Sequence, residues 1–370
     1  MFHRANYLEA AFCGEVDFSG TTFSEAYFLR TLFLENACFD HAKFLENVHF
    51  DNAIFSAGSW KRSFDVIKKI SFRRVNFRKQ EKVIFDNVDM SKVSFIHTDI
   101  TRVRFRNTRW SEEAGGYNIY DKQLLLLKRN EKYRKKYFKQ ALKELKKLKN
   151  NKKLLEKIIE ELYRPKGRDE LNRKIEEHVK EIKEFLNNIN NMVVLKEFEY
   201  EWNQQVIKGL EKEDDLTLDN ILSIYRMLRE NYDYYLKYEE SGKFFVGEMD
   251  TKRLFKKGRY TIKEKITSQL EETVLTIYRW LCLYGESYIR PIIWILVTIF
   301  GFALLRSLWM QKLNIDPLTF IEQLKMSAVI FFQMTKELGW LTLLERLIAA
   351  ITLGTLYISL RRKLERRIRH

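Results

Sequence analysis

The sequence contains few of the residues that build active sites and disulfide frameworks. Its three cysteines, Cys13, Cys38 and Cys282, are odd in number and far apart, so neither a disulfide set nor a zinc site is predicted, and a reducing compartment is expected. The six histidines have no metal-ligand spacing, and the chain lacks a glycine-rich phosphate loop and a Gly-x-Ser-x-Gly motif. We therefore expect that the protein is not an enzyme and that it has no catalytic residue, no cofactor and no metal site.

The sequence also has few prolines, and its first residues do not resemble a signal peptide. Only three prolines occur, Pro165, Pro291 and Pro317, and each falls at a boundary between predicted segments. The first residues, MFHRANYLEAAF, lack the basic and then apolar pattern of a cleaved signal peptide. The net charge of +16 over 370 residues favours an anionic partner, either a lipid surface or a nucleic acid, and the length allows two or three domains.

Aromatic residues recur about every five positions in the first 110 residues, as in Phe18, Phe23, Phe28 and Phe33. A period of five fits neither a helix nor a flat strand, but it fits a chain that turns one corner every five residues. Four such sides make a coil, and about nineteen units predict nearly five stacked coils, roughly 20–25 Å tall. The phenylalanines expected in this core are Phe23, Phe28, Phe33, Phe44, Phe55, Phe77, Phe85, Phe95 and Phe105.

This register resembles that of the pentapeptide-repeat family over residues 2–111. The resemblance implies a right-handed quadrilateral β-helix, which we assign to residues 1–112 with an insert at 56–69. Some members of that family mimic DNA with a uniformly acidic surface. Here residues 1–57 hold three Lys/Arg against eight Asp/Glu, whereas residues 58–110 hold fourteen against five. The change of sign argues against DNA mimicry, and a protein partner of the β-helix remains a hypothesis.

The middle of the chain is rich in Lys, Leu, Glu and Tyr and predicts helices. One long helix is expected from Tyr120 to about Tyr163, ended by Pro165 and Gly167, with a second helix returning as a hairpin or coiled coil over 120–215. A helical linker follows over 216–284. Eleven basic and two acidic residues lie between Lys128 and Lys149. Such a face is either solvated or available to headgroups and nucleic-acid phosphates.

Two apolar segments predict membrane spans within residues 288–360. The first contains fifteen uncharged residues at 291–305, and the second contains fourteen at 347–360. With their flanks, both approach the length needed to cross a hydrocarbon core of about 30 Å, although a buried soluble helix remains the alternative for the second. Residues expected at the membrane interface are Arg290, Arg306, Trp309, Trp340, Arg361, Arg362 and Lys363.

The charge distribution predicts the orientation of these spans. Six Lys/Arg occur in the basic tail, residues 361–370, which places the C-terminus in the cytoplasm. Two spans return the chain to its starting side, so the N-terminal region is expected there too. The predicted fold class is thus a multidomain β + α protein of the cell membrane, with a β-helix, a helical middle and two transmembrane helices.

An apolar half-helix at 316–333 lies between the two spans and is too short to cross a bilayer. Span, half-helix, loop and span is the order of the two-span potassium-channel module, which this region resembles. A potassium filter needs a Thr-x-Gly-Tyr-Gly type of run, whose glycines let successive carbonyls point the same way. This chain offers only QMTKELGW, so the filter is missing. The candidate pore-loop residues are Gln333, Thr335, Lys336, Glu337 and Gly339.

Three hypotheses follow from these segments. The first is a channel-derived membrane protein, a homo-oligomer and a tetramer by analogy, with lost or altered ion conduction. The second is a membrane-anchored scaffold that binds another protein and transports nothing. The third, a nucleic-acid-binding protein with basic surfaces, ranks last. Polar residues on one face of the second span would favour a channel, and the sequence offers Thr352 and Thr355 with Glu345 near the entrance.

Overall fold

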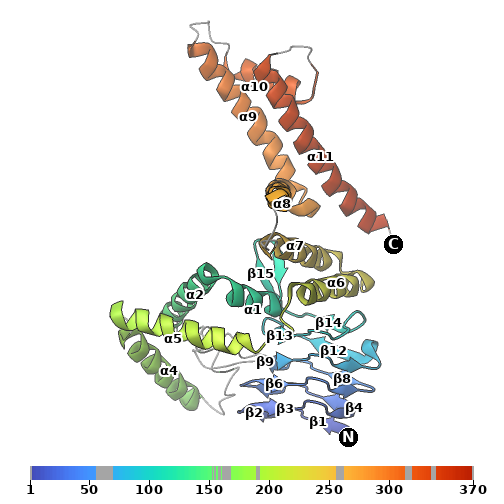
Figure 1. Cartoon of the computed structure of the whole chain (residues 1–370), viewed down its shortest axis with the longest axis vertical. Coiled ribbons are helices and arrows are strands. Elements are labelled where there is room, and N and C mark those ends of the chain that lie inside the picture. The colour runs from blue at the N-terminus through green and yellow to red at the C-terminus, as the bar shows by residue number, and fades with distance from the viewer. Residues whose placement is uncertain are drawn as a thin grey trace. The chain divides into compact units, whose positions relative to one another are not determined.

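The computed structural model describes residues 2–55, 70–151, 168–188, 192–255, 262–312, 319–334 and 339–368, together with 153, 156 and 160. The chain divides into two compact units, Met1–Gly247 and Glu248–His370. Four sequence predictions lie wholly or partly outside the described residues: the insert at 56–69, the helix end at Pro165 and Gly167, the start of the half-helix at 316–318, and the pore-loop residues at 335–337. Each unit is described in turn (Figure 1).

The first unit begins with a β-solenoid of about four turns, which confirms the repetitive β fold expected from the five-residue period. Its strands pair in parallel, and partners such as Phe23 and Phe44, or Phe85 and Phe105, stand about four five-residue units apart. The strands are β1 (Phe2–Asn6), β2 (Ala11–Phe12), β3 (Val16–Asp17), β4 (Thr22–Tyr27), β5 (Leu32–Phe33), β6 (Ala37–Cys38), β7 (Lys43–Phe44), β8 (Val48–His49), β9 (Ile54–Phe55), β10 (Ile70–Ser71), β11 (Asn76–Phe77), β12 (Val83–Asp86), β13 (Val93–Ser94) and β14 (Arg104–Arg106). They form three sheets with the orders β11-β7-β4-β8-β12-β14 (with β1 on β4), β13-β10-β6-β3 and β2-β5-β9.

Aromatic rings form four columns inside the solenoid. The centroids of neighbouring rings in a column lie 4.7–5.8 Å apart, because coils stack at the spacing of paired strands. The nine phenylalanines expected in the core are all buried, with at most 5% of their surface exposed. The columns are Phe2–Phe23–Phe44–Phe77, Tyr7–Phe28–Phe50–Phe85–Phe105, Phe12–Phe33–Phe55 and Phe18–Phe39–Phe72–Phe95.

Helix α6 (Leu218–Tyr234) covers the last coil of the solenoid. The amide of Asn231 is buried and donates to the carbonyls of Ile100 and Val103, at 2.8 and 2.7 Å. A solenoid has no following strand at its end, so these carbonyls need another donor. Asn231 provides that donor and thus closes the end of the stack.

Aromatic contacts extend the same cap. The ring of Tyr232 stacks on Phe105 at 6.2 Å, and its hydroxyl accepts a hydrogen bond from Nε1 of Trp110 at 2.9 Å. Burial raises the pKa of the Tyr232 hydroxyl well above its ordinary value. One aromatic column of the solenoid therefore continues into a helix.

The hairpin β15 (Ser111–Glu113) and β16 (Gly116–Asn118) pairs antiparallel and packs against α7 (Tyr238–Phe255). A Cβ atom on Gly247 would lie only 2.1 Å from the carbonyl oxygen of Tyr117 and 2.6 Å from the ring of Tyr225. A side chain at Gly247 would therefore force the hairpin and the helix apart.

The helical middle contains α1 (Tyr120–Arg129), α2 (Glu131–Asn150), α4 (Arg168–Asn188) and α5 (Met192–Glu211). The helix expected to run on from Tyr120 instead breaks at Asn130, whose backbone is extended. The Asn130 side chain accepts from the backbone N–H of Tyr133 at 3.1 Å, and Arg134 donates to the carbonyl of Leu127 at 2.6 Å. The Asn130 and Arg134 side chains satisfy groups at the two new helix ends, which makes the break favourable.

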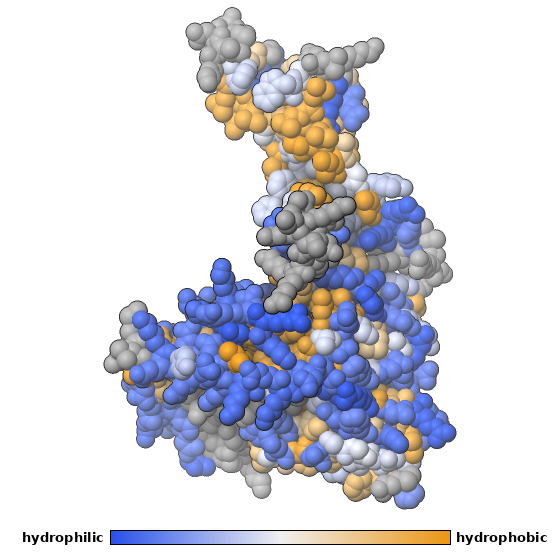
Figure 2. Space-filling view, viewed as in Figure 1, coloured by the Kyte–Doolittle hydropathy of each residue, from blue (hydrophilic) through white to orange (hydrophobic). Residues whose placement is uncertain are grey.

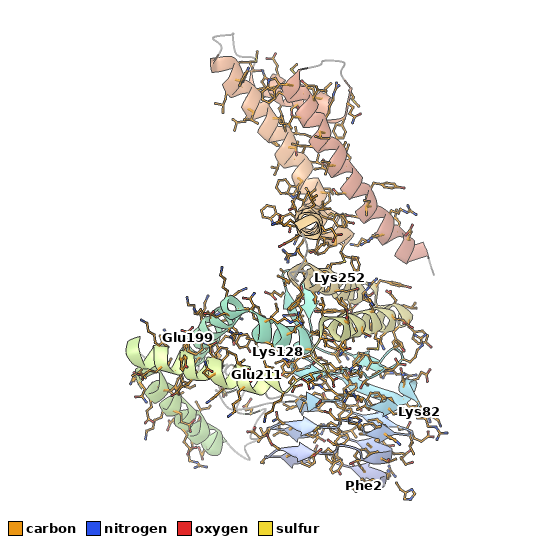
Figure 3. The ribbon with its side chains drawn as sticks, viewed as in Figure 1. Phe2, Lys82, Lys128, Glu199, Glu211 and Lys252 are labelled. Atoms are coloured by element: carbon orange, nitrogen blue, oxygen red, sulfur yellow. The ribbon has the colours of Figure 1, made fainter. Side chains whose placement is uncertain are left out.

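A buried arginine joins the solenoid to this helical region. Arg73 contacts the carboxylates of Glu213 and Asp121 and donates to the hydroxyl of Ser94 at 3.2 Å. Burial opposes its charge, but the two carboxylates outweigh that effect, so the pKa of the Arg73 guanidinium lies above its ordinary value. Lys128 donates a hydrogen bond to the Glu213 carbonyl at 3.1 Å. Figure 3 labels Lys128 and Glu211, the last residue of α5.

The second unit contains α8 (Ile262–Cys282), the short helix η3 (Leu283–Gly285), α9 (Ile289–Lys312), α10 (Phe320–Phe331) and α11 (Trp340–Ile368). Among the described residues, two segments are long and apolar enough to cross a membrane, Ile289–Met310 and Trp340–Glu365. Only 17% and 28% of their apolar windows are buried. A core helix of a soluble protein would be mostly buried, and the apolar surface of this unit is instead exposed (Figure 2).

Candidate functional site

Of the five candidate pore-loop residues, the structure describes Gln333, shortly after α10, and Gly339, just before α11. Gln333 has a left-handed backbone (φ 60°), and the N–H groups of Gln333 and Met334 donate to the carbonyls of Ile330 and Val329. This pattern is a Schellman cap, which ends α10. Thr335, Lys336 and Glu337 lie outside the described residues. Gly339 has room for a methyl group, because within the described part of the chain a Cβ there would meet only the Thr342 hydroxyl, at 3.5 Å.

A polar cluster is buried where α9, α10 and α11 meet. Arg306 of α9 forms an ion pair with Glu345 of α11, and their surfaces are 9% and 0% exposed. Ser327 of α10 is fully buried, and its hydroxyl reaches both the Glu345 carboxylate and the carbonyl of Ile299, the latter at 2.9 Å. These contacts fix the short helix against both long ones.

Gln323 extends the cluster by one turn of α10. Its side chain is 1% exposed, and its nitrogen donates to the sulfur of Met310 at 2.9 Å. Its Oε1 atom, like Nη1 of Arg306, has no hydrogen-bond partner among the described residues. The cluster therefore retains one spare acceptor and one spare donor.

Hydroxyl groups form a buried stripe along α11. Thr342, Thr352, Thr355 and Ser359 are all at most 8% exposed, and Glu345 belongs to the same face. The last three hydroxyls donate to carbonyls of their own helix, as side chains of this type do in apolar surroundings. The residues that would favour a channel thus face the interior of the chain's own helices. Large apolar side chains cover the outer surface of α11.

Arg306 was expected at the membrane interface, but the structure turns its side chain inward to Glu345. The position lies one helical turn from Trp309, so the guanidinium could have reached water. Pairing with a buried carboxylate keeps it inside, because that carboxylate would otherwise lack a counter-charge.

The other expected interface residues make contacts at the two ends of the long helices. At one end, Lys363 lies over the ring of Tyr288 at 4.3 Å, and Arg362 donates to the Tyr284 carbonyl at 2.6 Å. Arg361 pairs with Glu365, and Arg290 donates to the Arg279 carbonyl at 3.2 Å. At the other end, the rings of Trp309 and Trp340 meet edge to face at 5.9 Å.

Charge pairs also occupy part of the basic helix that could contact phosphates. Lys135 pairs with Glu131 at 2.7 Å, and Lys136 lies 3.7 Å from Glu113. These carboxylates reduce the positive field of that face. Nucleic-acid binding remains a prediction.

Sequence reasoning missed Ser327 and Gln323, although a signal was present. The two polar residues stand four positions apart in a mostly apolar helix, and so they share one face. Arg306 and Glu345 are opposite charges in two apolar segments, which also predicts a pair.

Comparison of the chain with family models, with curated proteins and with solved structures gives no match.

Proposed function

We propose that this protein is a two-span membrane protein whose helices α9 and α11 anchor a cytoplasmic β-solenoid and helical region at the cell membrane. The observation that carries the proposal is the division of α9, α10 and α11 into two surfaces. Arg306, Glu345 and Ser327 point inward, whereas the exposed surface is apolar over both long helices. Lipid favours this arrangement and water opposes it.

The lengths support the same proposal. Arg290 and Trp309 are nineteen residues apart on α9, which corresponds to about 28 Å along a helix. That length is close to a hydrocarbon core of about 30 Å. The tryptophan pair at one end and the arginines and lysine at the other match the two interfaces of a bilayer. In this proposal the solenoid is of the right-handed, four-sided pentapeptide-repeat type and serves as a protein-binding scaffold.

The topology test uses single cysteines in a chain whose Cys13, Cys38 and Cys282 are replaced by alanine. Met334→Cys, which is 77% exposed, lies between α10 and α11, and Leu364→Cys lies in the C-terminal part of α11, after its uncharged run at 347–360. We expect a membrane-impermeant maleimide to label Met334→Cys on intact cells, and Leu364→Cys only after permeabilisation. Tyr200→Cys in α5, which is 65% exposed, is the matched reporter for the N-terminal side. Labelling of Met334→Cys and Leu364→Cys from the same side would contradict two spans.

A second candidate function, ion conduction by an oligomer, is favoured by one observation. Helix α10 packs against both long helices, in the order span, short helix, span. However, the hydroxyls and the carboxylate of α11 face inward, so a ring of copies lined by its outer surface would be apolar.

Flux measurements in liposomes decide between anchoring and conduction. Potassium, sodium and chloride are tested separately with full-length protein whose insertion is verified. We expect no flux above that of protein-free liposomes. If the protein does conduct, and Gly339→Trp abolishes the flux while Gly339→Ala keeps it, the loop lines the path of the ions.

A further inference from the structure

Helix α8 carries an exposed apolar stripe, which consists of Leu270, Val274, Ile277 and Trp280. These side chains are 52–63% exposed, and their spacing of four, three and three places them on one face. The opposite face is occupied: Arg279 pairs with Asp250, and Cys282 is buried and donates to the Tyr278 carbonyl. The stripe is therefore not used by the unit's own core.

The chain turns sharply between α8 and α9. Leu283, Tyr284 and Gly285 have left-handed backbones in succession, with φ values of 52°, 59° and 85°. The turn is held by Tyr284, whose hydroxyl donates to Asp250 at 2.8 Å. Figure 1 shows α8 almost end-on beside the lower ends of α9 and α11, so its axis runs across theirs.

The stripe is continuous with the apolar surface of α9. The ring of Trp294 lies 6.1 Å from that of Trp280, and its Nε1 donates to the Trp280 carbonyl at 3.3 Å. Trp294 is on the second turn of α9, beside the exposed side chains of Ile293 and Val297. The apolar stripe of α8 thus faces the side on which the spans rise.

We propose that α8 lies in the interface of the same bilayer, across the ends of the spans, with its stripe among the outer acyl chains and its polar face in water. The proposal rests on the proposed function, since it requires α9 and α11 to cross the membrane. A helix of this kind buries its apolar face about 5–10 Å into the boundary between headgroups and acyl chains, and tryptophan is the residue most favoured there. Lys363, over the ring of Tyr288, and Arg290, bonded to the Arg279 carbonyl of α8, lie near the turn between α8 and α9, where anionic headgroups would meet them.

Spin labels on single cysteines in proteoliposomes of full-length protein test this placement. The native cysteines are replaced by alanine, and labels are placed at Val274 and Ile277 in the stripe and at Glu272 on the opposite face. Collisions with oxygen, which concentrates in lipid, are compared with collisions with a water-soluble nickel complex. We expect oxygen to dominate at Val274→Cys and Ile277→Cys, and nickel to dominate at Glu272→Cys.

Reference labels at Val297 and Ile351 separate the two proposals. If both are accessible to nickel, the spans themselves are refuted. If both lie in lipid while the stripe labels are in water, only the placement of α8 is overturned. Stripe labels shielded from both reagents would also overturn it, because protein, such as a second copy, would then cover the stripe.

A paired substitution provides a second measurement on a folded chain. Val274→Ser with Ile277→Ser is expected to move a label at Leu270 from lipid to water and to leave a label at Val297 in lipid. The matched pair Glu271→Ser with Glu272→Ser, on the polar side, should leave the Leu270 label where it was. An unchanged Leu270 label in the first pair contradicts binding through the stripe.

Discussion

Replacing Glu345 by leucine is expected to destabilise the C-terminal unit by about 3–5 kcal/mol, because the Arg306 guanidinium would stay buried without its counter-charge. The single substitution Arg306→Met should have a similar effect, since it leaves the carboxylate alone. The double variant Arg306→Met with Glu345→Leu removes both charges and keeps apolar volume. We expect its stability to return close to that of the wild type. Thermal or SDS-induced unfolding in detergent micelles would measure these differences.

The exposed pair Arg361–Glu365 is the matched control for this cycle. Both of its side chains are largely exposed, so Glu365→Leu should change stability little. If the double variant is as unstable as the sum of the two single variants, Arg306 and Glu345 are not coupled. The helices would then be held by packing alone.

Replacing Asn231 by leucine is expected to open the end of the solenoid. The Val103 carbonyl would lose the Asn231 donor, and the Ile100 carbonyl would keep only the backbone N–H of Val103, at 3.3 Å. A buried carbonyl left unpaired costs about 1–3 kcal/mol. Because coils contact mainly their neighbours, the effect should be local. Amide hydrogen exchange in the full-length protein should accelerate over residues 93–106 and change much less over residues 22–33.

Asn203 provides the comparison, since its amide donates to a single carbonyl of its own helix, that of Glu199, at 2.8 Å. Asn203→Leu should leave exchange in the solenoid unchanged. Equal exchange over residues 93–106 in the wild type and in Asn231→Leu would show that the cap does not depend on this side chain.

The solenoid was predictable because its information is local and repeated. Each large residue such as Phe50 stands five or six positions from the next, and it stacks on residues one coil away, here Phe28 and, beyond the insert at 56–69, Phe85. If the aromatic residue of a unit stood one position away, its ring would leave the core, so the pattern must recur in every repeat. The break at Asn130 was less visible, because two side chains, Asn130 and Arg134, decide it against an otherwise continuous helical pattern.

The candidate site was only partly predictable. The sequence places Arg306 near the end of one apolar segment and Glu345 near the start of another, and either side chain could have reached water. Their contact depends on how α9, α10 and α11 pack, and Ser327 of the short helix completes it. Three separate segments have to meet before that pairing exists.

By itself, the sequence determined a β-solenoid with a phenylalanine core and two apolar helices long enough to span a membrane, since both depend on periodicity and length within short stretches. Tertiary structure alone decided which way the polar side chains of α11 face, that α6 closes the solenoid, and that α8 runs across the ends of α9 and α11. Those features arise from contacts between residues tens to more than a hundred positions apart. Their free energy belongs to the packed arrangement and to no single segment.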